Sequence, residues 1–156
     1  MNVTLHLAGP KDAARIFEMQ RKAFAPLLAR YHDDETSPAA EPLQKTVDRL
    51  LDPSTDFYLI CAEEIPVGAA RVLRVNETVC RLGPLFVLPA FQGRGVAQVA
   101  LPQLEALYPR ARLWRLDTLL EEKGNCHLYE KAGYRQTGSC RKVNDLLTLV
   151  DYEKHL

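Results

Sequence analysis

The sequence predicts a mixed α/β fold in which one sheet carries helices on both faces. Three segments rich in β-branched and aromatic residues follow one another at residues 57–62, 66–75 and 78–87, and short turns separate them, as in an antiparallel meander. Strand-like and helical segments on either side complete the order β-α-α-β-β-β-α-β-α-β-β, with about seven strands. The 156 residues show no repeat or interdomain linker, so we expect a single domain over residues 1–156.

The N-terminal third is predicted to hold one strand and two helices. Residues 3–8 alternate as a strand does, and residues 9–12 then begin a helix with an apolar stripe. Pro26 is expected to end or bend that helix, because proline lacks the N–H that a helical hydrogen bond needs. An acidic, turn-rich loop at residues 32–38 follows, and a second helix is expected at residues 42–51.

The C-terminal half is predicted to add two helices and three strands. The first helix, at residues 95–108, has an apolar face of Val96, Val99, Ala100, Leu104 and Leu107. The following elements are a strand at residues 112–118, a short helix at 125–131 and strands at 134–138 and 144–153. Gly133 is suited to end the short helix in a left-handed conformation.

Composition excludes several classes of function. Twenty basic and twenty acidic residues cancel, so no overall field would recruit nucleic acid or an anionic membrane. No apolar run reaches the roughly 20 residues that span a bilayer. The four cysteines are scattered singly, and no secretory signal precedes the first strand, so we expect reduced thiols in a cytoplasmic protein. Cys126 is interpreted as a packing residue rather than a nucleophile.

The most informative segment is the glycine-rich turn at residues 92–97, between a strand and a helix. Gly93 and Gly95 allow several backbone N–H groups to approach one anion at the helix N-terminus, and Arg94 could add a charge-assisted contact. A simple strand-to-helix turn is the plain alternative. A dinucleotide fingerprint fails because Gln98 replaces its third glycine, although Asp117 stands at a suitable distance. A triphosphate loop fails because Gly-Lys-Ser/Thr is absent, so no metal site is expected.

Two motifs resemble those of the GNAT superfamily of N-acetyltransferases. The turn is similar to the family's pyrophosphate loop, Gln/Arg-x-x-Gly-x-Gly/Ala, and matches it at Gln92, Gly95 and Ala97. The later segment at residues 125–134 fills every fixed position of the pattern Asn-x-x-x-Tyr-x-Lys-x-Gly-Phe/Tyr. The motifs follow one another about thirty residues apart, with one strand between them. The resemblance implies a mixed, mostly antiparallel sheet of the GNAT type that splays open between its fourth and fifth strands.

The resemblance also implies that acetyl-coenzyme A is the co-substrate and assigns residues to it. Phe86 and Val87, on the splayed fourth strand, would offer backbone groups to the pantetheine arm. The pyrophosphate would lie on the amides of Gly93, Arg94, Gly95, Val96 and Ala97, with the side chains of Gln92 and Arg94 beside its oxygens. Asn125 would hydrogen-bond the pantetheine, and Tyr129, one helical turn later, would protonate the departing thiolate. The N–H of Val87 would hold the oxyanion.

The acceptor is expected to be a primary amine of a small molecule or a peptide. By position in the fold, the stretch with Tyr31, Asp34 and Glu35 would cover the acceptor side, where an acidic surface attracts a cationic amine. Arg30 and Arg71 could oppose this attraction or bind an acceptor carboxylate. No carboxylate lies on the fourth strand to act as base; the candidates are Asp33, Asp34, Glu35, Glu77, Asp117, His6 and His127, or a chain of water.

Two other functions fit the same motifs. A non-catalytic acyl-coenzyme A sensor would have them without turnover, and an acyltransferase for longer chains would need more space near Phe24, Tyr31 and Phe86. A homodimer is also expected, through an edge strand formed by the apolar residues 146–152.

Overall fold

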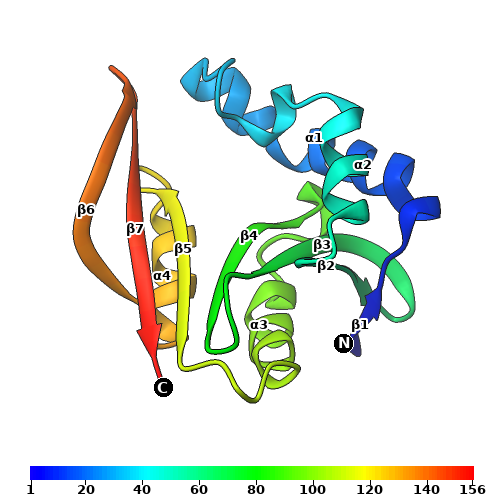
Figure 1. Ribbon diagram of the computed structural model, residues 1–156. Helices are drawn as coiled ribbons and strands as arrows, with labels where there is room; N and C mark the ends of the chain where they lie inside the picture. Colours follow the sequence, from blue (N-terminus) through cyan, green and yellow to red (C-terminus); the bar gives the residue numbers. More distant parts are fainter.

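The computed structural model describes all 156 residues and contains one seven-stranded sheet (Figure 1). The strands are β1 (Val3–Leu7), β2 (Thr55–Ala62), β3 (Ile65–Arg74), β4 (Val79–Val87), β5 (Leu113–Leu119), β6 (Arg135–Asn144) and β7 (Leu147–His155). Their order in the sheet is β1-β2-β3-β4-β5-β7-β6. Every neighbouring pair is antiparallel except β4 and β5, which are parallel. The predicted fold class is therefore confirmed.

Helices cover both faces of this sheet. They are α1 (Ala13–Tyr31), α2 (Leu43–Leu51), α3 (Val96–Ala106) and α4 (Lys123–Lys131), with single 3₁₀ turns at Pro10–Asp12, Pro38–Ala40 and Pro89–Phe91. Strand residues point alternately to the two faces and so feed two apolar clusters. The smaller cluster joins Ile16, Met19 and Ala23 of α1 to Phe57, Leu59, Cys61, Ala69 and Phe86. The larger cluster packs α3 and α4 against the other face, around Trp114 and Leu116 of β5.

Three sequence expectations are corrected by packing. Pro26 does not end helix α1, which continues to Tyr31, because buried side chains on both sides of the proline anchor it to the rest of the fold. Val99 of α3 and Leu107, the C-cap of α3, are 45% and 50% exposed, while Leu101 is buried, so the buried stripe is rotated from the predicted one. Strand β6 extends to Asn144 instead of ending at residue 138, because it forms a long hairpin with β7.

The central feature of the sheet is the fork between β4 and β5. Their parallel pairing covers three residue pairs, from Val79↔Leu113 to Arg81↔Arg115, and then stops. Figure 1 shows the two strands side by side at one end and diverging toward the other. At the fork, Arg81 of β4 and Asp117 of β5 form an ion pair at 3.1 Å. Pro84 cannot donate a ladder hydrogen bond, which suits a strand that leaves its neighbour here. The predicted splay is confirmed.

The edge strand expected to form a dimer is not an edge. Strand β7 lies between β5 and β6, so both of its sides are paired within the chain, and β6 is the edge strand on that side. The sequence missed this because pairing order is not encoded locally. No helix of the protein combines the length and apolar character that a membrane crossing requires.

Candidate functional site

The glycine-rich turn presents an open helix N-terminus. Gly93 and Gly95 have φ angles of +75° and +80°, in the left-handed region that favours glycine. A Cβ atom added to either would meet no atom within 4 Å, so backbone conformation rather than space requires glycine here. Gly95 is the N-cap of α3 and provides no side-chain cap. The N–H groups of the first turn of α3 are therefore available to an anion.

Backbone groups at the end of β4 face the fork. A Cβ on Gly68 of β3 would come within 2.1 Å of the Phe86 oxygen, so this oxygen points toward β3. The N–H of Val87, in the same planar trans peptide unit, points the opposite way, toward the fork. Phe86 is paired with Ala69 of β3 and its backbone groups face that strand, so the prediction that Phe86 offers backbone groups to the fork is wrong, and only Val87 has backbone groups on the open side. Gln92 donates from Nε2 to the Val87 oxygen at 2.8 Å, which fastens the glycine-rich turn to the strand end.

A cavity of about 910 Å³ opens in the fork and brings most of the predicted cofactor residues together. Those that line it are Phe86, Val87, Gln92, Gly93, Gly95, Val96, Ala97, Asn125 and Tyr129. Arg94 is the exception, because its guanidinium lies over the Phe91 ring, 5.6 Å from the centroid, and does not line the cavity. The volume is in the range of natural ligand sites.

Tyr129 lies on α4 with its ring in the core and its hydroxyl at the cavity. The residue is 8% exposed, and its ring contacts those of Tyr134 and Tyr152 with centroids 5.8 and 6.4 Å away. The hydroxyl makes no hydrogen bond with another protein group, and, unlike the indole nitrogen of Trp114, it is not sealed from solvent. Burial, and then the charge of Asp117, raise the pKa of Tyr129 well above its usual range. The phenol is therefore a protonated donor at neutral pH.

The other end of the cavity is lined by charged side chains from distant parts of the chain. Tyr31, at the end of α1, donates to Glu122 at 2.6 Å, and Arg30 pairs with the same carboxylate at 2.9 Å. Glu41 accepts from Arg49 at 2.9 Å; although burial disfavours its charge, this guanidinium holds the pKa of Glu41 below its usual range. We call this end, away from the glycine-rich turn, the acceptor end.

The acidic loop contributes differently from the prediction. Asp34 and Glu35 do not line the cavity, whereas Asp33 does, with only 6% of its surface exposed. Asp33 accepts hydrogen bonds from the N–H groups of Glu35 and Thr36 and from the Thr36 hydroxyl, so it holds the loop in shape. Tyr31 lines the cavity as predicted.

Arg71, on β3, differs from the other arginines of the acceptor end. Its Nε donates to the Gly83 oxygen, where the β3–β4 register shifts, and no carboxylate pairs with it. Burial, with the nearby charge of Arg49, lowers the pKa of Arg71 to about 10. Its terminal amino groups have no hydrogen-bond partner in the protein.

Only some of the seven candidate bases lie at the cavity. Asp33, Asp117 and His127 line the cavity. Asp117 is held by Arg81 at 3.1 Å and by Arg141 at 2.8 Å. His6 instead contacts Thr4 on β1. Sequence reasoning missed Glu41, Arg49, Arg81, Glu122 and Arg141, because each is an isolated charge in its own element.

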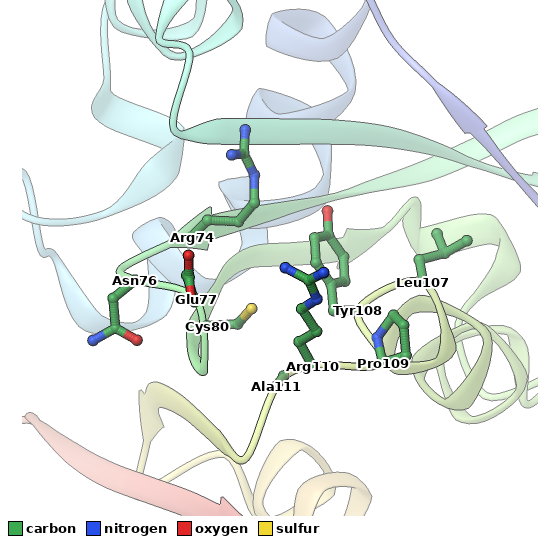
Figure 2. A pocket seen from close by; sticks show the side chains of 9 residues that line it. All are labelled: Arg74, Asn76, Glu77, Cys80, Leu107, Tyr108, Pro109, Arg110 and Ala111. Atoms are coloured by element: carbon green, nitrogen blue, oxygen red, sulfur yellow. The ribbon is translucent and has the colours of Figure 1, made fainter.

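A second hollow, of about 540 Å³, lies at the opposite end of β4 (Figure 2). Its walls come from the β3–β4 turn, with Glu77, and from the segment after α3. Arg74 already pairs with Asp56 at 3.0 Å, and Tyr108 donates to the same carboxylate at 2.6 Å. No residue of either sequence motif lines this hollow, so it is not the site that they form.

Comparison with known proteins identifies the family. A profile of the acetyltransferase (GNAT) family matches residues 14–134, which contain both motifs. No curated protein sequence matches the chain significantly. Among solved structures, an acetyltransferase from Thermus thermophilus superposes with a TM-score of 0.76 at 19% identity, covering 100% of this chain and 98% of its own.

Two further structures have the same fold at lower identity. A spermidine N-acetyltransferase from Vibrio cholerae, in complex with CoA and spermine, has a TM-score of 0.77 at 15% identity, covering 98% of this chain and 95% of its own. The ribosomal-protein-S18-alanine N-acetyltransferase from Escherichia coli has a TM-score of 0.79 at 12% identity, covering 99% and 94%. With the forked sheet, the two motifs and the family profile in agreement, the chain belongs to the GNAT acetyltransferase family.

Proposed function

We propose that the protein is an acetyl-coenzyme A-dependent N-acetyltransferase that moves the acetyl group to a primary amine by direct transfer in a ternary complex. One observation carries the proposal: the forked cavity has three sets of unpartnered donors where such a reaction needs them. These are the first-turn amides of α3, the N–H of Val87 and the hydroxyl of Tyr129.

The residues present fit the cofactor. The α3 amides and helix dipole suit a pyrophosphate, adding roughly 0.3–1 kcal/mol for a nearby anion. The open side of β4 and the exposed amide of Asn125 suit the peptide-like groups of the pantetheine arm. Gln92 contributes by holding the turn against Val87 rather than by reaching the phosphates.

Each catalytic role follows from a donor and its surroundings. Acetyl-coenzyme A, when bound, supplies a thioester that an amine can attack. The N–H of Val87 would donate to the carbonyl oxygen of that thioester and stabilise negative charge on it. Tyr129 remains protonated because burial raises its pKa, so its hydroxyl can give a proton to the sulfur as thiolate character develops.

Removal of the amine proton is the step for which the cavity offers no free carboxylate. Asp117 is held by two arginines, and Asp33 accepts three hydrogen bonds from its own loop. The oxygens of both carboxylates are thus already occupied by partners within the protein. His127, exposed on α4, also lines the cavity. We therefore propose that water in the open cavity, or His127, takes this proton.

The test is a calorimetric titration with coenzyme A and acetyl-coenzyme A. Gln98→Glu places a carboxylate in the first turn of α3, where Gln98 lines the cavity. Val99→Glu is the matched control, because Val99 is 45% exposed and does not line the cavity. An acidic residue suits a helix N-terminus in both variants, so the fold should be kept.

We expect micromolar binding by the unaltered protein and by Val99→Glu, and binding at least about tenfold weaker by Gln98→Glu. Two unit charges 10 Å apart repel by roughly 1.7 kcal/mol at an effective dielectric constant of 20, and the pyrophosphate carries more than one. Absence of binding by the unaltered protein would overturn the proposed function.

A further inference from the structure

The acceptor end of the cavity contains one more arginine than its carboxylates can pair. The charged groups that line the cavity are five arginines, Arg30, Arg49, Arg71, Arg81 and Arg141, with Lys131, and four carboxylates, Asp33, Glu41, Asp117 and Glu122. Glu122 pairs with Arg30, and Glu41 pairs with Arg49. Asp117 pairs with both Arg81 and Arg141, and Asp33 is used by its own loop. Among the five arginines, Arg71 alone has no carboxylate.

The orientation of Arg71 leaves its binding groups free. Its Nε is fastened to the Gly83 oxygen, which fixes the plane of the guanidinium and leaves both terminal amino groups without a protein acceptor. The side chain is half-buried. The guanidinium groups of Arg49 and Arg81 repel it, and the carboxylates of Glu41 and Asp52 attract it without pairing with it. A partly desolvated cation in such a place gains most from an anion that accepts two parallel hydrogen bonds.

This anion site is separate from that for the cofactor's pyrophosphate. Gly83 precedes Val87 by four residues of strand, about 13 Å, in the direction away from the glycine-rich turn. Arg71 therefore lies beyond the proposed reaction centre, where the acceptor would enter.

We propose that the acceptor is an amine that also carries a carboxylate, and that the guanidinium of Arg71 binds this carboxylate while the amine faces Val87 and Tyr129. This inference rests on the proposed function and names its substrate class. A polyamine brings only positive charge to an end that already has a surplus guanidinium, so polyamines are disfavoured. The predicted attraction of a simple cationic amine by Asp34 and Glu35 loses its basis, because neither residue lines the cavity.

The experiment measures acetylation of matched amines by release of the coenzyme A thiol. The probes are the twenty common L-amino acids and ω-amino acids of increasing length, each compared with its carboxamide, together with spermidine. Binding of the same probes to the coenzyme A-loaded protein is measured by calorimetry. The variants are Arg71→Gln, which removes the charge, and Arg71→Lys, which keeps the charge but loses the two-pronged geometry. Arg115→Gln is the control, because this β5 arginine pairs with Glu153 and does not line the cavity.

We expect at least one acid to be acetylated and its carboxamide to react at least about tenfold more slowly. Arg71→Gln should lower kcat/KM for the acid by roughly 10- to 100-fold, the range expected for a hydrogen-bonded charge pair. It should not change kcat/KM for the carboxamide, whereas Arg115→Gln should change neither. Affinity for coenzyme A should be the same in all variants; if Arg71→Gln does not fold, Arg71→Lys gives the comparison.

Preference for spermidine or for carboxamides, or an acid that reacts equally well with Arg71→Gln, would overturn the inference and leave the proposed function intact. Coenzyme A binding without binding of any acid would do the same. Failure of the unaltered protein to bind coenzyme A would instead refute the proposed function itself.

Discussion

The substitution Tyr129→Phe separates the proposed chemistry from stability. The hydroxyl of Tyr129 has no protein partner, so its removal orphans no donor or acceptor, and the ring can keep its contacts with Tyr134 and Tyr152. The free energy of unfolding should therefore change by less than about 1 kcal/mol. Loss of a general acid typically lowers turnover 10²- to 10⁴-fold, which corresponds to about 3–5 kcal/mol in the activation barrier.

The matched control is Tyr134→Phe, for which the opposite pattern is expected. The hydroxyl of Tyr134 donates to Glu105 at 2.7 Å, and Tyr134 does not line the forked cavity. Loss of this hydrogen bond to a charged group should reduce the free energy of unfolding by about 1.5–3 kcal/mol. Turnover at a temperature where the variant stays folded should be nearly unchanged.

Three measurements on each variant decide the outcome: thiol release with an accepted amine, calorimetric affinity for coenzyme A, and urea unfolding. Coenzyme A affinity should be nearly unchanged in Tyr129→Phe. Turnover by this variant within about threefold of the unaltered enzyme would refute the assignment of Tyr129 as the acid. Tight coenzyme A binding by the unaltered protein with no turnover on any amine would favour the sensor function instead.

Gly68→Ala should lower the free energy of unfolding by about 1–3 kcal/mol and reduce turnover, because the new Cβ would lie 2.1 Å from the Phe86 oxygen and displace β4. Urea unfolding and thiol release measure the two effects, and a variant of normal stability would contradict the close approach. Gln92→Glu should weaken coenzyme A binding about tenfold in a calorimetric titration, since a carboxylate cannot donate to the Val87 oxygen; unchanged affinity would show that this bond does not hold the turn. Stability should fall as the pH rises above about 10, because burial raises the pKa of Tyr134, so the unfolded chain loses this proton before the folded protein does. Each tyrosine of this kind lowers the free energy of unfolding by up to about 1.4 kcal/mol per pH unit. Measured by urea unfolding from pH 9 to 11, the free energy of unfolding should therefore fall less with rising pH in Tyr134→Phe than in the unaltered protein.

The grouping of the proposed cofactor residues around one cavity was predictable because its determinants are local. Positive φ angles select glycine at Gly93 and Gly95 within a single turn, and the spacing of Asn125 and Tyr129 places both on one helix face toward the cavity. The general strand and helix order followed from hydrophobic periodicity in the same way. The open side of Val87 was anticipated from the splay, but its carbonyl partner was not, because a glutamine side chain in a loop can turn in many directions.

Local pattern was insufficient where packing decides. Pro26 would end a helix in isolation, yet α1 continues past it because contacts elsewhere in the protein support both halves. Val99 and Leu107 fit an apolar stripe as well as Leu101 does, and only the position of the sheet selects Leu101 for burial. The edge strand is β6 and not β7, because the order of strands in the sheet depends on how distant segments pair after folding.

The sequence by itself determined that the chain has a GNAT-type fold and which motif residues are proposed to bind the coenzyme, because short segments encode turns, helix starts and periodicity. Only the tertiary structure decided the acceptor end. Arg30 meets Glu122 across 92 positions of sequence, and Arg81 meets Asp117 across 36. Charge pairing depends on groups that the chain brings together only on folding. Arg71 can therefore be recognised as the one cavity-lining arginine without a carboxylate partner only when all the partners are in place.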